Sequence, residues 1–175
     1  SKPLPNGANF DLDDNTPKVL HHKSGLGEFV LSSDSIGHTY RWESMSHIID
    51  QIPPKEINSF FSLSSTIGGY ILFPARKIDN KMTINGSRGL NPKIRDRFDL
   101  TLECIRRFYS NENSPLSDTL QRYSLFFSLF QDFKGYVDFF LLQDLVEENY
   151  LAIKPYLPSN GFDRPPIPNT VEEYK

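Results

Sequence analysis

Residues 93–109, KIRDRFDLTLECIRRFY, carry the pattern that decides the fold. Apolar side chains recur there at steps of three or four residues, which aligns them in one helical stripe. The stripe consists of Ile94, Phe98, Leu102, Ile105 and Tyr109. Asn91 and Pro92, just before it, supply an N-cap and the proline favoured at the first helical position. We therefore expect a long amphipathic helix that begins at Asn91–Pro92 and packs on a core.

Two more helical patterns follow this stripe. Ser114–Pro115 repeats the signal of a cap followed by proline. The next stripe consists of Leu116, Leu120, Tyr123, Phe127 and Phe130. Residues 136–146 are then apolar on nearly every side, which is typical of a helix that is enclosed by neighbours or offers a face to a partner chain. The sequence predicts a helical core built from these three segments.

Shorter elements precede the helices. Weak alternation predicts strands at 28–31 and 36–41, and apolar spacing predicts a helix over 42–52 and another from Pro54. The apolar run 70–73 predicts a buried strand, and Asp79–Asn80 predicts a turn that returns the chain as a paired strand over 81–84. The expected fold is α+β, a mainly helical single domain with a small antiparallel sheet. We expect an extended N-terminal arm at 1–20, the α+β domain at 21–154 and a Pro-rich C-terminal wrap at 155–175.

Size and composition limit the class of protein. The chain has 175 residues, enough for one domain with a sizeable core, and 14 Phe and 8 Tyr predict that this core is rich in aromatic rings. The formal net charge of −3 gives no global cationic field, which argues against nucleic acid as a partner. Apolar runs fall short of the ~20 residues of a membrane-spanning helix. Together with the single Cys104, this predicts a cytoplasmic protein without membrane attachment.

The segment 85–91, NGSRGLN, is the best candidate for a functional site. We expect a glycine-punctuated loop that leads into a helix N-terminus, where free N–H groups and the helix dipole favour an anion. Arg88 adds a forked donor for phosphate or carboxylate, and Arg95 lies close along the predicted helix. The candidate ligand-binding residues are therefore Asn85, Arg88, Asn91 and Arg95. The alternative is a tight loop that only shapes turns and caps the helix, with Arg88 paired to a nearby Asp.

Other polar residues give weaker signals. Asp96, Asp99 and Glu103 share a predicted helix and, with His21 or His22, are residue types that a metal-dependent phosphoester hydrolase or nuclease uses as ligands. The neighbouring arginines favour an ion-pair face instead. Because the histidines lack the spacing of a metal motif, we predict no metal site, identify no catalytic residue and assign no cofactor. Cys104 lies among apolar positions and is expected to be buried rather than nucleophilic.

Four motifs lie within residues 66–146: TIGGYILFP, MTINGSRG, RDRFDLTLECIRR and GYVDFFLLQDLV, and the stretches SKPLPNG, HHKSGLGEF and RPPIPNTVEEY lie outside that range. Together they resemble a family of uncharacterised bacterial proteins, a domain of unknown function. The resemblance implies a bacterial, cytoplasmic origin and one intact domain, and it carries over no functional residue. Three functions therefore stay open: a binding module for an anionic small molecule or a protein partner, a metal-dependent hydrolase or nuclease, and a structural domain that forms homo-oligomers.

Overall fold

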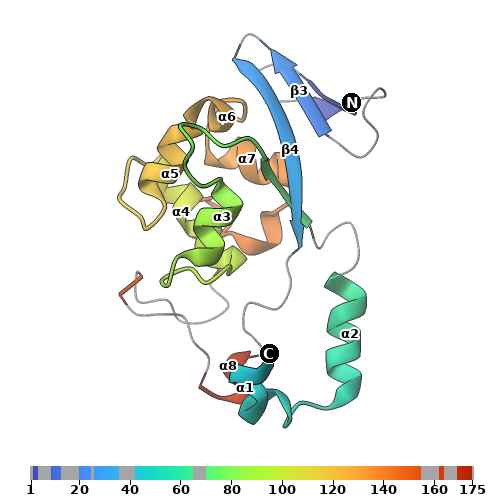
Figure 1. The fold of residues 1–175 in the computed structure, drawn as a ribbon. Coiled ribbons are helices and arrows are strands. Elements are labelled where there is room, and N and C mark those ends of the chain that lie inside the picture. Colours follow the sequence, from blue (N-terminus) through green and yellow to red (C-terminus); the bar gives the residue numbers. More distant parts are fainter. Residues whose placement is uncertain are drawn as a thin grey trace.

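The structure is a computed structural model that describes residues 2–3, 9–12, 20–24, 26–35, 42–64, 70–154, 162–163 and 169–174. These residues form an antiparallel sheet, a body of short helices beside it, and a second, smaller group of helices (Figure 1). The predicted class, a mainly helical α+β domain with a small antiparallel sheet, is confirmed.

The described strands form one sheet in the order in which they occur in the sequence, each antiparallel to the next. They are β1 (Lys2–Pro3), β2 (Asn9–Leu12), β3 (Leu20–Ser24), β4 (Gly27–Ser35) and β5 (Tyr70–Pro74). β3 and β4 form a tight hairpin, where Gly27 has the left-handed φ of 136° that favours glycine. The strands predicted at 28–31 and 70–73 are confirmed, whereas the one predicted at 36–41 lies outside the described residues.

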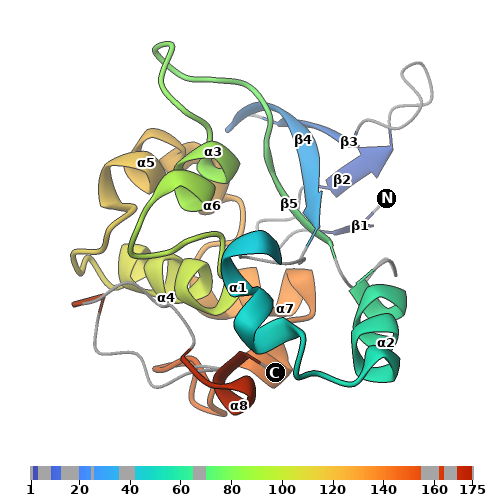
Figure 2. The same cartoon turned by 60° about the horizontal axis from the view of Figure 1, so that its bottom comes forward.

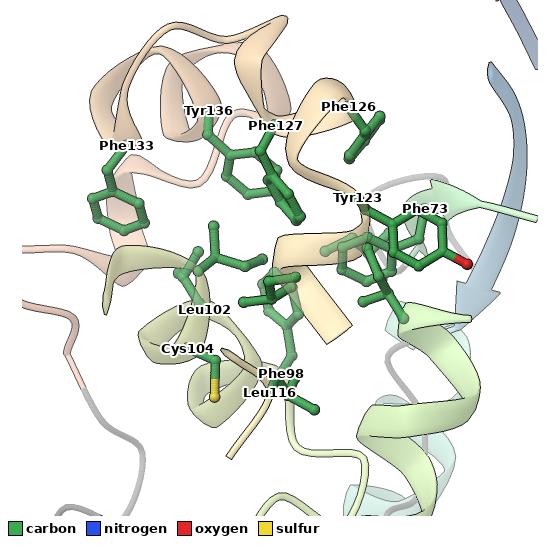
Figure 3. Close-up of a cluster of buried hydrophobic side chains, with 14 of the residues drawn as sticks. Phe73, Phe98, Leu102, Cys104, Leu116, Tyr123, Phe126, Phe127, Phe133 and Tyr136 are labelled. Carbon is green, nitrogen blue, oxygen red and sulfur yellow. The ribbon is translucent and has the colours of Figure 1, made fainter. Parts of the chain in front are cut away.

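The main helical body buries the aromatic side chains. Its helices are α3 (Ile84–Leu90), α4 (Phe98–Tyr109), α5 (Ser117–Arg122), α6 (Ser124–Ser128) and α7 (Phe133–Phe140), followed by the short 3-10 helix η2 (Gln143–Leu145). Phe130 contacts the Tyr136 ring edge-to-face at 5.2 Å between centroids, and Tyr136 lies 4.7 Å from Phe140. Each such pair adds about 0.5–1.5 kcal/mol to the burial of its apolar area. Figure 3 shows Tyr136 and other rings of this body clustered with Leu102, Cys104 and Leu116, so the predicted aromatic-rich core is confirmed.

One aromatic contact joins the sheet to this body. The ring of Phe29 on β4 meets that of Phe126 on α6 edge-to-face, with 5.8 Å between centroids. Phe73 of β5 is completely buried in the same core, which explains why its apolar run forms a strand. The sheet is therefore fixed to the helices through β4 and β5.

A second apolar cluster holds α1 (Trp42–Ile49), α2 (Pro54–Ser64) and α8 (Val171–Tyr174) together. Met45, Ile48 and Ile49 of α1 form its centre, and Ile57 and Val171 pack against them. Figure 1 shows these three helices in the lower part of the view, apart from the main helical body, and their cluster is distinct from the aromatic core. α1 and α2 match the predicted helices, and Pro53–Pro54 separates them as expected because proline cannot continue a helix.

The structure corrects the prediction for residues 70–91. Asp79 and Asn80 form the predicted turn with φ of 51° and 58°, but the chain does not return as a strand over 81–84. Thr83 instead caps a helix, its side chain accepting a hydrogen bond from the Gly86 N–H at 3.2 Å. The predicted hairpin at 70–84 and the predicted loop at 85–91 are therefore wrong: β5 pairs with β4, and 84–90 is α3.

Three predicted helix boundaries are also wrong. The helix expected from Asn91–Pro92 begins only at Phe98, because residues 92–96 form turns in which Arg95 and Asp96 have positive φ. The helix expected over 116–130 is divided at Tyr123 into α5 and α6. The helix expected over 136–146 begins earlier and ends at Phe140, because Leu141 adopts the left-handed conformation. In each case a local backbone change interrupts the helix that the apolar pattern predicts.

The structure describes only parts of the expected arm at 1–20 and of the expected C-terminal wrap at 155–175. β1 and β2 of the expected arm at 1–20 pair with each other, and β2 pairs with β3. Much of the Pro-rich segment 155–168 lies outside the described residues. Within the described ranges, no helix combines the length and apolar character that crossing a membrane requires.

Candidate functional site

Arg88 occupies the buried face of α3. Ile84, Ser87 and Arg88 point into the protein from consecutive turns of this helix, and Thr119 of α5 donates a hydrogen bond to Ser87 Oγ at 3.1 Å. The Thr83 cap fixes where the helix begins and therefore which face Arg88 occupies. The Arg88 side chain is only 1% exposed.

The Arg88 guanidinium binds two residues that follow α3. Nη1 donates to Asp96 Oδ1 and Nη2 to the Asp96 carbonyl oxygen, both at 2.5 Å. Nε donates to Thr101 Oγ1 of α4 at 3.0 Å. The pairing of Arg88 with a nearby Asp, which the sequence left open as an alternative, is thus observed. All three nitrogens are engaged, so Arg88 links α3 to the turn and to α4 rather than facing solvent.

Asn91 is also engaged within the chain. Its Oδ1 accepts a hydrogen bond from the Lys93 N–H at 2.9 Å, which shapes the turn, and its Nδ2 donates to the Pro115 carbonyl at 3.3 Å. Asn85 lies half-buried on α3, one turn before Arg88. Asn85 therefore lies in the first turn of α3, and Asn91 caps its C-terminal end.

Arg95 differs from the other arginines of this segment. Arg88, Arg97, Arg106 and Arg107 each form an ion pair. Arg95 is half-buried with Nε fully enclosed, yet its side chain has no hydrogen-bond or ion-pair partner among the residues that the structure describes. Its φ of 47° places it in the left-handed turn that Arg88 holds through Asp96. Of the two candidate arginines, Arg88 is paired with Asp96, and Arg95 is the one without a partner among the described residues.

Comparison with known proteins gives one match. A family model described as "Family of unknown function (DUF6994)" matches residues 1–175. The chain belongs to this family, DUF6994. No curated protein and no solved structure matched the chain.

Asp99 and Glu103, the carboxylates on α4 of this DUF6994 member, form ion pairs with arginines. Asp99 pairs with Arg97, whose Nε donates to Oδ1 at 2.9 Å. Glu103 accepts from Arg106 at 2.8 Å and from Arg107 at 2.7 Å, which is the ion-pair face that the neighbouring arginines predicted. Arg95 precedes α4 and forms none of these ion pairs.

Metal binding has no support in the described part of this DUF6994 member. Within it, no group of three or more His, Cys, Asp or Glu side chains is arranged to hold a metal ion. His21 and His22 are neighbours on β3, opposite Val30 and Phe29 respectively.

Cys104 belongs to the core, as expected. Burial raises the pKa of its thiol from 9.0 to about 12, so the thiol stays protonated and unreactive near neutral pH.

The sequence analysis missed the helix α3, although the sequence contained a signal for it. Thr83 is a favoured N-cap residue, and Ile84, Ser87 and Arg88 have the spacing of one helical face. The two glycines of the segment obscured that signal.

Proposed function

We propose that this DUF6994 member is a binding module that takes an anionic ligand at the turn between α3 and α4, with Arg95 as the contacting cation. One observation carries the proposal: the Arg95 guanidinium is half-buried and has no partner in the described ranges. A cation that is partly removed from water without a partner loses hydration free energy. A phosphate or carboxylate would compensate this loss through a forked, charge-assisted contact.

Two features of the turn support this role. Arg88 and Asp96 hold the backbone beside Arg95, so less conformational entropy would be lost when a ligand binds. The N-cap residue of α4, Arg97, makes no side-chain capping bond, and the positive end of this helix favours negative charge nearby. In this proposal Arg88 and Asn91 position the turn, and Asn85 is a further candidate contact.

A thermal-shift titration with inorganic phosphate, ADP and succinate tests the proposal. A ligand at a hundred times its Kd should stabilise the protein by about 2.7 kcal/mol. For a domain of this size, that corresponds to a rise in melting temperature of about 5–10 °C.

Arg95→Gln should abolish the shift, while Arg95→Lys should retain part of it because the charge remains. Lys55→Gln, at an exposed lysine of α2, is the matched control and should respond as the wild type does. Equal shifts in Arg95→Gln and the wild type would reject Arg95 as the contact. The absence of any shift with all three anions would reject the proposed site.

We also propose self-association as a second candidate function, because several leucines are strongly exposed. They are Leu90, Leu141 and Leu151, each more than two-thirds exposed. Exposed apolar side chains of this size can take part in contacts between copies of a chain. Sedimentation equilibrium should show a concentration-dependent dimer that Leu141→Ser and Leu151→Ser weaken. A monomer at all concentrations would reject this alternative.

A further inference from the structure

The connection between β5 and α3, residues 75–82, presents cations that have no ion-pair partner in the described part of the chain. Arg76, Lys77 and Lys81 are exposed, and Asp79 is the one acidic residue among them. No ion pair in the described ranges involves any of these three cations. The whole chain carries a net charge of −3, so this segment is locally opposite in sign to the rest of the protein.

Side chains from the helical body hold this cationic loop at both ends. The buried Tyr123 donates its hydroxyl hydrogen to the Arg76 carbonyl at 2.9 Å. Arg122 Nη2 donates to the Met82 carbonyl at 3.2 Å. Figure 2 shows the segment projecting beyond β5 and α3 before it returns.

The tip of the loop has a defined backbone. Asp79 and Asn80 both adopt left-handed conformations, and the Lys81 N–H bonds the Ile78 carbonyl at 3.0 Å. Ile78 packs against the main core and attaches the middle of the loop to it. The cations therefore project from a pre-ordered support, which lowers the entropy lost on binding.

We propose that the loop 75–82 is a docking site for an acidic protein segment that also carries apolar side chains. The acidic groups of the partner would meet Arg76, Lys77 and Lys81. Met82, which is 48% exposed beside these cations, supplies a flexible apolar contact. This apolar neighbour, and the small number of cations, favour a protein segment over nucleic acid, whose binding relies on many phosphate contacts. The proposal concerns a surface other than Arg95 and does not depend on the anion site.

Fluorescence polarisation tests the proposal with a labelled peptide that combines Asp and Glu with Leu and Phe. The matched variants are K77E/K81E, in the loop, and K55E/K154E, at exposed lysines of α2 and of the segment after η2. Both change the net charge equally. The peptide should bind the wild type, and K77E/K81E should weaken binding by about tenfold or more, while K55E/K154E stays within about twofold. Circular dichroism checks that both variants are folded.

The remaining arms determine the class of partner. Tyr123→Phe keeps every charge but removes the hydrogen bond that holds the Arg76 carbonyl. This variant should therefore also weaken peptide binding. A single-stranded oligothymidylate of equal charge should bind more weakly than the peptide. Equal losses in the two lysine variants, tighter binding of the oligonucleotide, or no peptide binding by the wild type at millimolar concentration would each overturn the proposal.

Discussion

Arg88 and Asp96 are joined by three hydrogen bonds that use both main chain and side chain. The Asp96 N–H donates to the Arg88 carbonyl at 3.1 Å, and two guanidinium nitrogens donate to the Asp96 carbonyl and carboxylate at 2.5 Å each. Arg95 and Asp96 have φ of 47° and 66°, a left-handed conformation that Asp tolerates better than Arg does. Arg88 therefore stabilises a left-handed turn, and this turn determines where Arg95 lies.

Replacing Asp96 with Asn should destabilise the protein because it leaves a buried guanidinium without its counter-charge. Asn keeps the size of Asp and tolerates the left-handed backbone. Removing one partner of a fully buried pair costs about 3–5 kcal/mol, and since the Asp96 side chain is 39% exposed, we expect about 2–3 kcal/mol. Urea denaturation measures the change in the free energy of unfolding.

Asp138→Asn is the matched control for this experiment. Asp138 pairs with Lys134 at the surface, where solvent screens the interaction, so its loss should be clearly smaller. Equal losses in the two variants would show that Arg88 does not depend on the Asp96 charge.

The partly buried Tyr109 and the fully buried Tyr136 should respond differently to removal of the hydroxyl group. The Tyr109 hydroxyl donates to the Phe127 carbonyl at 2.7 Å, whereas the Tyr136 hydroxyl has no partner in the part of the chain described. Burial raises the pKa of both groups, so both stay neutral. Tyr109→Phe should therefore cost about 1 kcal/mol, and Tyr136→Phe should be neutral or stabilising. A large loss for Tyr136→Phe in thermal unfolding would indicate a bound water or other unseen partner.

Leu141→Gly should stabilise the protein. Leu141 follows α7 with φ 58° and ψ 45°, and the Leu142 N–H bonds the Val137 carbonyl at 2.9 Å, a helix ending that favours glycine. Because the side chain is 75% exposed, little packing is lost, and relief of the left-handed strain should yield about 0.5–1 kcal/mol. Leu125→Gly, at an exposed position inside α6, should instead cost about 1 kcal/mol. Chemical denaturation measures the change in the free energy of unfolding, which should have opposite signs in the two variants. A loss of stability in both variants would contradict left-handed strain at Leu141.

Cys104 should resist thiol reagents in the folded protein. Its thiol is completely buried, so labelling at pH 8 requires unfolding and should be slower than in guanidinium chloride by about a thousandfold or more. The reaction with a chromogenic disulfide measures this rate. Rapid, stoichiometric labelling of the native protein would contradict the buried position.

The same thiol should make stability depend on alkaline pH. The folded-state pKa is raised from 9.0 to about 12, so between these values the unfolded state loses a proton that the folded state keeps. Stability should consequently be highest below pH 9 and fall toward pH 12. Urea denaturation at several pH values between 9 and 12 measures this fall in stability. Cys104→Ala should make the fall less steep, and an unchanged fall would show that other groups cause it.

The sequence predicted the elements whose signals are local. The stripe containing Phe98, Leu102 and Ile105 lies in α4 with all three side chains buried, and Pro53–Pro54 separates α1 from α2. Such patterns can be predicted because an apolar face at helical spacing must be buried whatever covers it. The pairing of Glu103 with Arg107 was predictable for the same reason, since residues four apart on a helix are neighbours.

The candidate site depended on contacts that no local pattern contains. The glycines at 86 and 89 suggested a loop, yet the Thr83 cap and the burial of Ile84 stabilise a helix there. Arg88 of this helix binds residues eight and thirteen positions ahead, beyond the end of α3, so no periodicity within a single element predicts these contacts. The sequence alone therefore determined the aromatic helical core, because hydrophobic periodicity depends only on residues that are close together in the sequence. Only the tertiary structure decided which arginine is buried in an ion pair and which lacks a partner within the described ranges, because the desolvation of a charge depends on what the whole chain places around it.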